Sequence, residues 1–384
     1  MIRTEPPRVA VLVGTSTGWG RRIIRGIASY ANKHGPWHLW VSGGDIEAPL
    51  RLPPHWAGEG IIARVARQAD IRLLDAAGAA AVNVSSIDLK AASYPRIAND
   101  LDASGRLAAE YLWNRGFRHF GYAGTPRLRY VRRHFRGFRD ALAALGCACT
   151  DFPTTTAGRG WHDGQLALVE RLRALPKPAA ILTWATPQGR AVLDACHWAG
   201  LIVPEQVAVL SGDDDRLMCE ICSPPLSGIA VGAEQIGHQA ATLLDRLMRG
   251  GRPPESPAFV APVAVVTRRS TDTLAMDNPR LVEAVAYIRN HAAQSIRVED
   301  VAGKVGVSRR QLERLFRETL GRTPGAEIQR LRLERAGELL AQSDLPVAEV
   351  AAISGFGTAE YLATLFKQAT GLTPLRYRST VRGR

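Results

Sequence analysis

Short apolar runs alternate with longer amphipathic stretches through the first 270 residues or so of the chain. Val9–Val13 predicts a buried strand, and a turn rich in Gly, Ser and Thr leads from it into an amphipathic helix at 21–34. The alternation continues with predicted strands at 60–63, 79–84, 118–124, 179–184 and 207–210 and predicted helices at 100–115, 135–145 and 190–199. Strands separated by such helices are typical of β-α-β units around parallel sheets. The pattern is too long for one ordinary doubly wound sheet and favours two lobes with a cleft between them.

A stretch rich in proline and glycine at 250–257 interrupts this pattern, and an extended piece at 259–266 follows. After Pro279 the pattern is helical, with apolar residues such as Leu281 and Val285 at helical spacing. The sequence therefore predicts a two-lobed α/β domain at 1–270, a linker at 271–280 and an all-α domain at 281–384.

The C-terminal region contains an internal repeat in which residues 298–324 match residues 348–374 at an offset of fifty. The matching pairs include Leu312 with Leu362, Phe316 with Phe366, Gly321 with Gly371, and Thr323-Pro324 with Thr373-Pro374. Two copies are too few for a solenoid, which needs three or more. We interpret the repeat as two helix-turn-helix units joined by one helix at 324–342.

Local chemistry supports this interpretation in the first unit. Gly306 suits a tight turn because glycine tolerates left-handed backbone, and Ser308 is a good helix N-cap. The helix that follows turns Leu312, Leu315 and Phe316 inward. Its opposite face carries Arg309, Arg310, Glu313, Arg314 and Arg317. A short basic helix of this kind fits the major groove of DNA.

The second unit repeats this design with less positive charge. Gly357 provides the turn and Thr358 the cap. Its exposed face carries Ala359, Glu360, Ala363, Thr364 and Lys367. The sequence therefore predicts a smaller contribution of this unit to base recognition.

The distribution of charge agrees with a nucleic-acid partner. The 384 residues include 49 Lys and Arg against 36 Asp and Glu, a net charge of +13. Residues 280–384 carry a net charge of +6, whereas the much longer stretch 1–279 carries +7. The C-terminal quarter is thus more than twice as basic per residue, which permits binding to DNA.

The repeat, followed by Phe366, Gly371, Thr373-Pro374 and Tyr377-Arg378, resembles the AraC-type DNA-binding domain over about 100 residues. The resemblance implies base contacts from Arg310, Glu313 and Arg314 in the first unit and from Ala359, Glu360, Ala363 and Thr364 in the second. The resemblance and the exposed faces of the two helices together predict a set of DNA-binding residues: Arg309, Arg310, Glu313, Arg314, Arg317, Thr358, Glu360, Thr364 and Lys367.

The first 270 residues resemble a LacI-type, periplasmic-binding-protein-like ligand domain. The resemblance rests on segments 19–27, 99–108, 203–214, 223–227 and 268–272. This order of domains is similar to that of the xylose operon regulators. It implies a sensor for a small sugar, most simply a xylose-like pentose.

Sugar sites combine polar groups that pair with hydroxyls and an aromatic face for the C–H side of the ring. The resemblance places Asp213, at a strand end, against ligand. The expected ligand-binding residues are Trp19, Arg21, Asp100, His134, Thr186 and Asp213, although Trp19 suits core packing equally well. The family commonly has arginine at the position of His134 and a carboxylate near Ala185-Thr186, and these departures change which hydroxyls are satisfied.

Other functions fit the sequence less well. The segment Gly14–Gly20 follows a strand but lacks the glycine spacing and the Gly-Lys-Ser/Thr of phosphate loops. Cys219 and Cys222 lack the two further ligands of a structural zinc site. A sugar-active enzyme, or a ligand-binding protein with a nonspecific DNA-binding tail, stays as the alternative. We expect no catalytic activity, cofactor or metal.

Cellular context follows from the same sequence. The longest apolar runs are far short of the roughly 20 residues that span a bilayer, and the N-terminus lacks a signal-peptide pattern. An odd number of cysteines, five, argues against a disulfide framework. We expect a cytoplasmic homodimeric regulator, an activator, a repressor or both, that binds promoter DNA and a sugar and contacts RNA polymerase.

Overall fold

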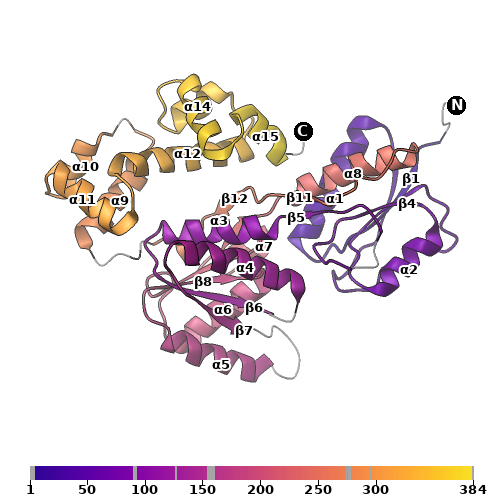
Figure 1. The fold of residues 1–384 in the computed structure, drawn as a ribbon, viewed down its shortest axis with the longest axis horizontal. Coiled ribbons are helices and arrows are strands. Elements are labelled where there is room, and N and C mark those ends of the chain that lie inside the picture. The colour runs from indigo at the N-terminus through magenta and orange to yellow at the C-terminus, as the bar shows by residue number, and fades with distance from the viewer. Residues whose placement is uncertain are drawn as a thin grey trace. The chain divides into compact units, whose positions relative to one another are not determined.

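The computed structural model describes residues 5–89, 93–125, 128–153, 161–273, 275, 278–294 and 296–382 (Figure 1). The chain divides into two compact units. The α/β unit contains Met1–Tyr111 and His119–Asp272, and the helical unit contains Leu112–Arg118 and Thr273–Arg382. Three of the predicted linker residues, 274, 276 and 277, lie outside the described residues.

The first sheet of the α/β unit is parallel and has the strand order β2-β1-β3-β4. Its strands are β1 (Arg8–Leu12), β2 (His38–Val41), β3 (Gly60–Ala63) and β4 (Ala80–Asn83), and its helices include α1 (Gly18–His34), α2 (Gln68–Ala77) and α8 (Ala233–Met248). Helices α1 and α8 pack closely because Gly26 and Gly237 face backbone. A Cβ at Gly237 would lie 2.0 Å from the carbonyl oxygen of Ile23.

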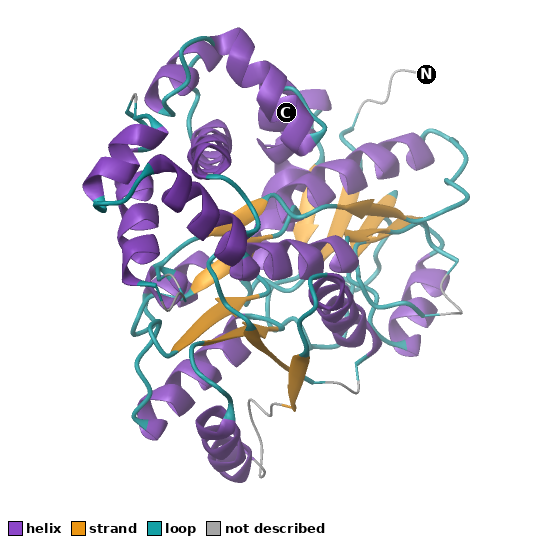
Figure 2. Ribbon diagram, turned by 60° about the vertical axis from the view of Figure 1, so that its left-hand side comes forward, coloured by secondary structure: helices purple, strands orange, loops and turns teal. Residues whose placement is uncertain are grey.

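The second sheet has the strand order β12-β10-β9-β8-β6-β7, and only the pairing of β10 with β12 is antiparallel among the described strands. Its strands are β6 (His119–Gly124), β7 (Cys149–Pro153), β8 (Ala179–Thr183), β9 (Val207–Ser211), β10 (Ser227–Ala230) and β12 (Ala264–Val266). Its helices are α4 (Arg129–Ala144), α5 (Trp161–Ala174), α6 (Thr186–Ala199) and the short α7 (Arg216–Glu220). Figure 2 shows the strands in two groups with helices around each. Strands β8 and β9 are buried along their whole length, as expected for central parallel strands.

Strand β5 (Ile97–Asn99) pairs in parallel with β11 (Ala258–Val260), and helix α3 (Leu101–Trp113) follows β5. The sequence predicted one extended piece at 259–266, but the structure has β11 and β12 there, in two different sheets. Pro262 lies between them, and proline cannot donate a ladder hydrogen bond. The short 3-10 helix η1 (Arg269–Thr271) ends the α/β unit.

The helical unit contains α9 (Pro279–His291), α10 (Val298–Lys304), α11 (Arg309–Leu320), α12 (Pro324–Gln342), α13 (Val347–Ile353), α14 (Ala359–Thr370) and α15 (Pro374–Arg382). Its described residues form two apolar cores. One surrounds Phe316 and includes residues of α9, α10 and α11, and the other surrounds Phe366 and includes residues of α13 and α14. These groups of helices lie at the two ends of α12 (Figure 1).

The predicted fold class is confirmed: parallel-sheet lobes precede an all-α region with two helix-turn-helix units. The bridging helix has the predicted bounds. Helix α4 starts six residues before the predicted 135, and α6 starts at Thr186 instead of residue 190. Among the described residues, no helix is long and apolar enough to cross a membrane.

Candidate ligand cavity and nucleic-acid-binding surface

A cavity of about 430 Å³ lies within the α/β unit, where residues after the carboxyl ends of strands from both sheets meet. Such strand ends are the usual ligand position in open parallel sheets. Trp19 enters from α1, Asn99 from the end of β5, and Asp213 from the loop after β9. The volume lies in the range of small-molecule sites.

Five polar atoms of this cavity are buried and have no hydrogen-bond partner among the described residues. They are Trp19 Nε1, Asn99 Oδ1, Ser104 Oγ, His134 Nε2 and Gln188 Oε1. A buried polar group without a partner costs roughly 1–3 kcal/mol, and native proteins keep few of them. Their concentration in one cavity therefore indicates a ligand rich in hydrogen-bonding groups.

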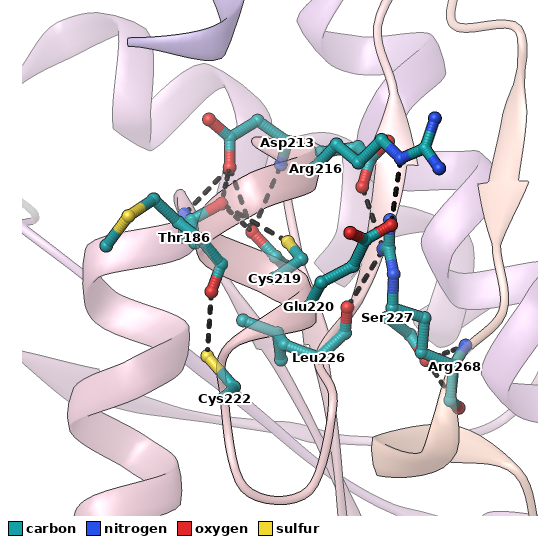
Figure 3. Close-up of polar contacts among 12 residues, drawn as sticks. Thr186, Asp213, Arg216, Cys219, Glu220, Cys222, Leu226, Ser227 and Arg268 are labelled. Carbon is teal, nitrogen blue, oxygen red and sulfur yellow. Dashed lines mark hydrogen bonds and ion pairs between the residues drawn. The ribbon is translucent and has the colours of Figure 1, made fainter. Parts of the chain in front are cut away.

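Asp213 is held by hydrogen bonds to one of its carboxylate oxygens. Oδ1 accepts from the backbone N–H of Thr186 at 2.7 Å, from the Thr186 hydroxyl at 2.6 Å and from the Ser211 hydroxyl at 3.0 Å. Figure 3 shows the second oxygen turned away from Thr186. Burial raises the pKa of Asp213, against the opposing effect of these hydrogen bonds. The fixed carboxylate leaves Oδ2 to accept from a ligand hydroxyl.

The two residues that follow connect the lobes. Asp215 Oδ2 accepts from the backbone N–H of Gly18 at 2.7 Å, which places a carboxylate at the N-terminus of α1, where it opposes the helix dipole. Asp214 pairs with Arg268 at 2.8 Å, and its carbonyl accepts from Arg22. Figure 3 includes Arg268 with Ser227, whose hydroxyl donates to the Arg268 carbonyl oxygen. The three consecutive aspartates thus have different roles. Asp213 lines the cavity, Asp214 pairs with Arg268, and Asp215 contacts the first lobe at Gly18.

His134 is a neutral member of the cavity. Only 1% of its surface is exposed, and its Nδ1 lies 2.9 Å from the hydroxyl of Tyr122. Burial lowers the pKa of His134 to about 4, although the charge of Asp102 opposes this shift. The imidazole therefore offers Nε2 to a ligand without a formal charge.

Aromatic rings form part of the cavity wall. Tyr130 and Trp184 stand edge to face with ring centroids 5.1 Å apart, and His134 contacts Trp184 in the same way at 5.4 Å. An aromatic face beside polar groups suits a sugar, which has one C–H side and many hydroxyls.

The six residues predicted to bind ligand separate into two groups. Trp19, His134 and Asp213 line the cavity. Arg21 instead donates to the Thr15 carbonyl and to Asp215, and Thr186 orients Asp213.

Asp100 accepts from the backbone N–H of Ala103 at 3.0 Å, at the start of α3, while the preceding Asn99 lines the cavity. Sequence reasoning missed Ser104, Tyr130, Trp184 and Gln188. Trp184 directly precedes the pair Ala185-Thr186 that the sequence singled out, and Gln188 follows it by two residues. The junction between strand β8 and helix α6 was therefore the signal that could have identified both.

No group of three or more His, Cys, Asp or Glu side chains that could hold a metal ion occurs in the part of the chain that the structure describes. Cys219 is buried and lies 3.7 Å from the Thr186 hydroxyl, whereas Cys222 donates to the carbonyl of Met218. Their environment is that of free thiols in a core.

Helix α11 presents the predicted basic face. Ser308 caps it, with its hydroxyl accepting from the backbone N–H of Gln311 at 3.2 Å. Leu312 and Phe316 are buried on the opposite side. Arg309 is exposed but already pairs with Glu313 at 3.0 Å and with Glu299 at 2.6 Å.

The other basic side chains of α11 are less engaged. Arg310 is exposed and has no ion-pair partner among the described residues. Arg314 lies 3.9 Å from Glu318 and Arg317 lies 3.9 Å from Glu313, both long for an ion pair. Exposed pairs of this kind contribute little to stability, so these arginines can reorient toward DNA.

Helix α14 repeats the scaffold with different surface chemistry. Thr358 caps it by accepting from the backbone N–H of Tyr361 at 3.2 Å, and Leu362 and Phe366 are buried. Glu360 and Lys367 are exposed, and the Thr364 hydroxyl donates to the Glu360 carbonyl. This face has one cation, Lys367, among the residues predicted to contact DNA.

Comparison with known proteins finds a family model for part of each unit. Residues 109–271 match the family model of the periplasmic binding protein-like domain, and residues 301–380 match that of a helix-turn-helix domain. A chain that combines these two parts with a polar cavity defines a class: ligand-responsive, DNA-binding transcription regulators.

Relatives over the whole chain narrow this class. The xylose operon regulatory protein of Escherichia coli strain K12 is 30% identical over 383 residues, which cover 98% of this chain and 97% of that protein. Its counterpart from Haemophilus influenzae is 26% identical over 97% of this chain and 98% of that protein. The solved structure of a xylose-binding transcription activator is 29% identical, covers 98% of both chains and superposes with a TM-score of 0.64. The chain belongs to the family of xylose operon regulatory proteins, which are AraC-type transcription regulators and not enzymes.

Proposed function

We propose that a neutral monosaccharide, xylose or a similar pentose, binds in the cavity of the α/β unit and controls promoter binding by the helical unit. The observation that carries this proposal is the set of five buried, unpaired polar atoms together with the fixed carboxylate of Asp213. The names of the relatives supply xylose as the first sugar to test.

The charges around the cavity favour a neutral ligand. Among the described residues, its charged lining residues are Asp213, Glu47 and Arg64, and Arg64 already pairs with Glu47 at 3.2 Å. Within this described lining, no cation pairs with Asp213, and its carboxyl suits a neutral sugar better than a sugar phosphate or a sugar acid. Hydroxyls of a neutral sugar can donate to Asp213 and accept from the indole N–H of Trp19.

Isothermal calorimetry with xylose, other pentoses, hexoses and a pentose phosphate tests this proposal. We expect Asp213→Asn to weaken sugar binding by roughly 10- to 100-fold, since a hydrogen bond to a charged group contributes about 1.5–3 kcal/mol. Asp140→Asn is the matched control, because Asp140 is exposed and pairs with Arg139 outside the cavity. Equal sugar affinity in both variants would remove Asp213 from the site.

The helical unit is the proposed reader of the promoter. Arg310 and Arg314 lie one turn apart on α11, and arginine pairs with guanine through two hydrogen bonds. A sugar can alter DNA binding only if it has different affinities for two states of the protein. Gel shifts with the chain's own promoter and with random DNA, each with and without sugar, test this control.

We propose further that the regulator acts as a homodimer and contacts RNA polymerase, as expected for promoter-bound regulators. Its DNA partner favours a place in the cytoplasm. Light scattering at several protein concentrations tests the dimer, and transcription from the promoter with purified polymerase tests activation and repression. Incubation with the protein should leave the sugar chemically unchanged.

A further inference from the structure

Residues Leu112–Arg118 belong to the helical unit, although the chain on both sides of them belongs to the α/β unit. This segment, which we call the 112–118 segment, contains the end of α3 and the turn into β6. The helical unit is therefore connected to the α/β unit at three points of the chain: through α3, into β6, and after Asp272. If the two units were joined by a simple linker, the connection after Asp272 would be the only one.

Arg322 holds this segment inside the helical unit. Its Nη1 donates to the side-chain oxygen of Asn114 at 2.6 Å, and its Nη2 donates to the backbone carbonyl of the same residue at 2.9 Å. The fixed fork of a guanidinium suits such a paired contact, which a lysine cannot reproduce.

The base of this contact is buried and ion-paired. The side chain of Arg322 is 14% exposed, and it pairs with Glu327, which is 1% exposed. Glu327 also receives two hydrogen bonds from Arg330, at 3.0 and 2.8 Å. The neighbouring cations lower the pKa of Glu327 against the effect of burial, so its carboxylate stays charged.

Two further hydrogen bonds attach the segment. Arg118 donates to the backbone carbonyl of Thr319, at the end of α11. The backbone N–H of Ala275, in the predicted linker, donates to the carbonyl of Arg115 at 2.9 Å. The segment thus contacts the end of a DNA-binding helix and the start of α12, where Arg322 lies just before Pro324.

The other end of the same helix reaches the cavity. Leu101 and Ser104, in the first turn of α3, line it, and Asn99 precedes the helix. Helix α3 has 13 residues and so spans about 20 Å as a stiff rod. Asn99 Oδ1 and Ser104 Oγ are among the buried polar atoms that have no hydrogen-bond partner among the described residues.

We propose that α3 and the 112–118 segment transmit ligand binding to the helical unit, and that Arg322 is the positioning residue that receives the signal. A ligand that satisfies Asn99 and Ser104 fixes the start of α3, and the paired contact with Asn114 passes its position to α11 and α12. This inference rests on the proposed function, because it requires a sugar that alters DNA binding. The coupling is defined as the ratio of DNA affinities with and without sugar.

Three variants of the full chain test it. Arg322→Lys keeps a cation beside Glu327 but loses the paired contact, and Asn114→Ala removes one acceptor while leaving the Glu327 ion pairs intact. Arg330→Lys is the matched control, since Arg330 pairs with Glu327 and Glu334 but not with Asn114. Calorimetry gives the xylose affinity, fluorescence anisotropy gives the DNA affinity with and without xylose, and circular dichroism verifies folding.

For Arg322→Lys and Asn114→Ala we expect the coupling ratio to fall at least fivefold, with xylose affinity within twofold of wild type. Arg330→Lys should keep the ratio within twofold. An unchanged ratio in Asn114→Ala and Arg322→Lys would overturn the inference, as would an equal loss in Arg330→Lys, which would indicate a general effect on packing. A wild-type chain that binds xylose without any change in DNA affinity would contradict the proposed function itself.

Discussion

Thr186 donates twice to a single oxygen of Asp213, once from its backbone N–H and once from its hydroxyl. This relationship fixes the orientation of the carboxylate before a ligand arrives. Preorganisation of this kind reduces the entropy cost of ligand binding, because the carboxylate is already ordered. We therefore expect Thr186 to influence sugar affinity although it does not line the cavity.

Thr186→Val should weaken xylose binding by about 5- to 10-fold, since a single hydrogen bond contributes roughly 1 kcal/mol or somewhat more. The valine keeps the shape of the side chain and the backbone donor, so DNA binding without sugar should stay unchanged. Calorimetry on Thr186→Val and on the control Thr242→Val, whose hydroxyl donates to the His238 carbonyl within α8, checks this. Wild-type affinity in a folded Thr186→Val would show that Asp213 needs no such support.

Acid should destabilise the α/β unit through His134. Burial lowers the pKa of His134 from an ordinary 6.5 to about 4. Between pH 6.5 and pH 4, the imidazole is therefore protonated in the unfolded chain but neutral in the folded chain. Stability therefore falls as pH decreases from 6.5, and the loss is complete below pH 4 at roughly 3 kcal/mol.

Between pH 7 and pH 5, the melting temperature of His134→Gln should fall less than that of wild type. Because all other titrating groups are common to both proteins, the difference between the two pH-dependent changes isolates His134. Parallel changes in melting temperature would place the pKa of His134 near its ordinary value.

Base recognition should differ between the two helix-turn-helix units. Arg314→Ala should relax specificity at one operator position by about 1–3 kcal/mol, as for loss of an arginine–guanine pair. Lys367→Ala should weaken binding to all sequences alike and lower the salt slope by about one charge, as for loss of a phosphate contact. Binding to a panel of operator mutants at several salt concentrations checks both, and the opposite pattern would exchange the roles of α11 and α14.

The helical unit should fold without the rest of the chain. Both of its apolar cores consist of residues after 280, so a fragment 279–384 retains them whole. It should show helical circular dichroism and weak DNA binding, with a lower melting temperature than a fragment supplied with the 112–118 segment as a peptide. An unfolded fragment would place the domain boundary elsewhere.

Local signals predicted much of this structure. The Ser308 and Thr358 caps, the inward leucine and phenylalanine positions and the bounds of α12 all follow from neighbours within a few residues. The fold class, which depends on periodic patterns, is confirmed. The family resemblance, which depends on specific matching segments, is confirmed as well.

Contacts between distant residues could not be predicted in the same way. Arg21 precedes Asp215 by 194 residues, and no pattern indicates that these two side chains meet. Asp100 and Asn99 are neighbours, yet the step from strand to helix turns one toward a backbone N–H and the other toward the cavity. The 112–118 segment reads as an ordinary turn, because its partner Arg322 lies 208 residues from Asn114.

The separate cores around Phe316 and Phe366 have an evolutionary consequence. Because each recognition helix packs on its own core, a substitution on the surface of α14 leaves the packing beneath α11 undisturbed. Under the proposed function, new side chains can therefore arise on one recognition helix while the other helix still contacts the old promoter. New target genes become reachable through single, individually tolerated mutations, and a duplicated motif becomes a route by which regulatory circuits diverge.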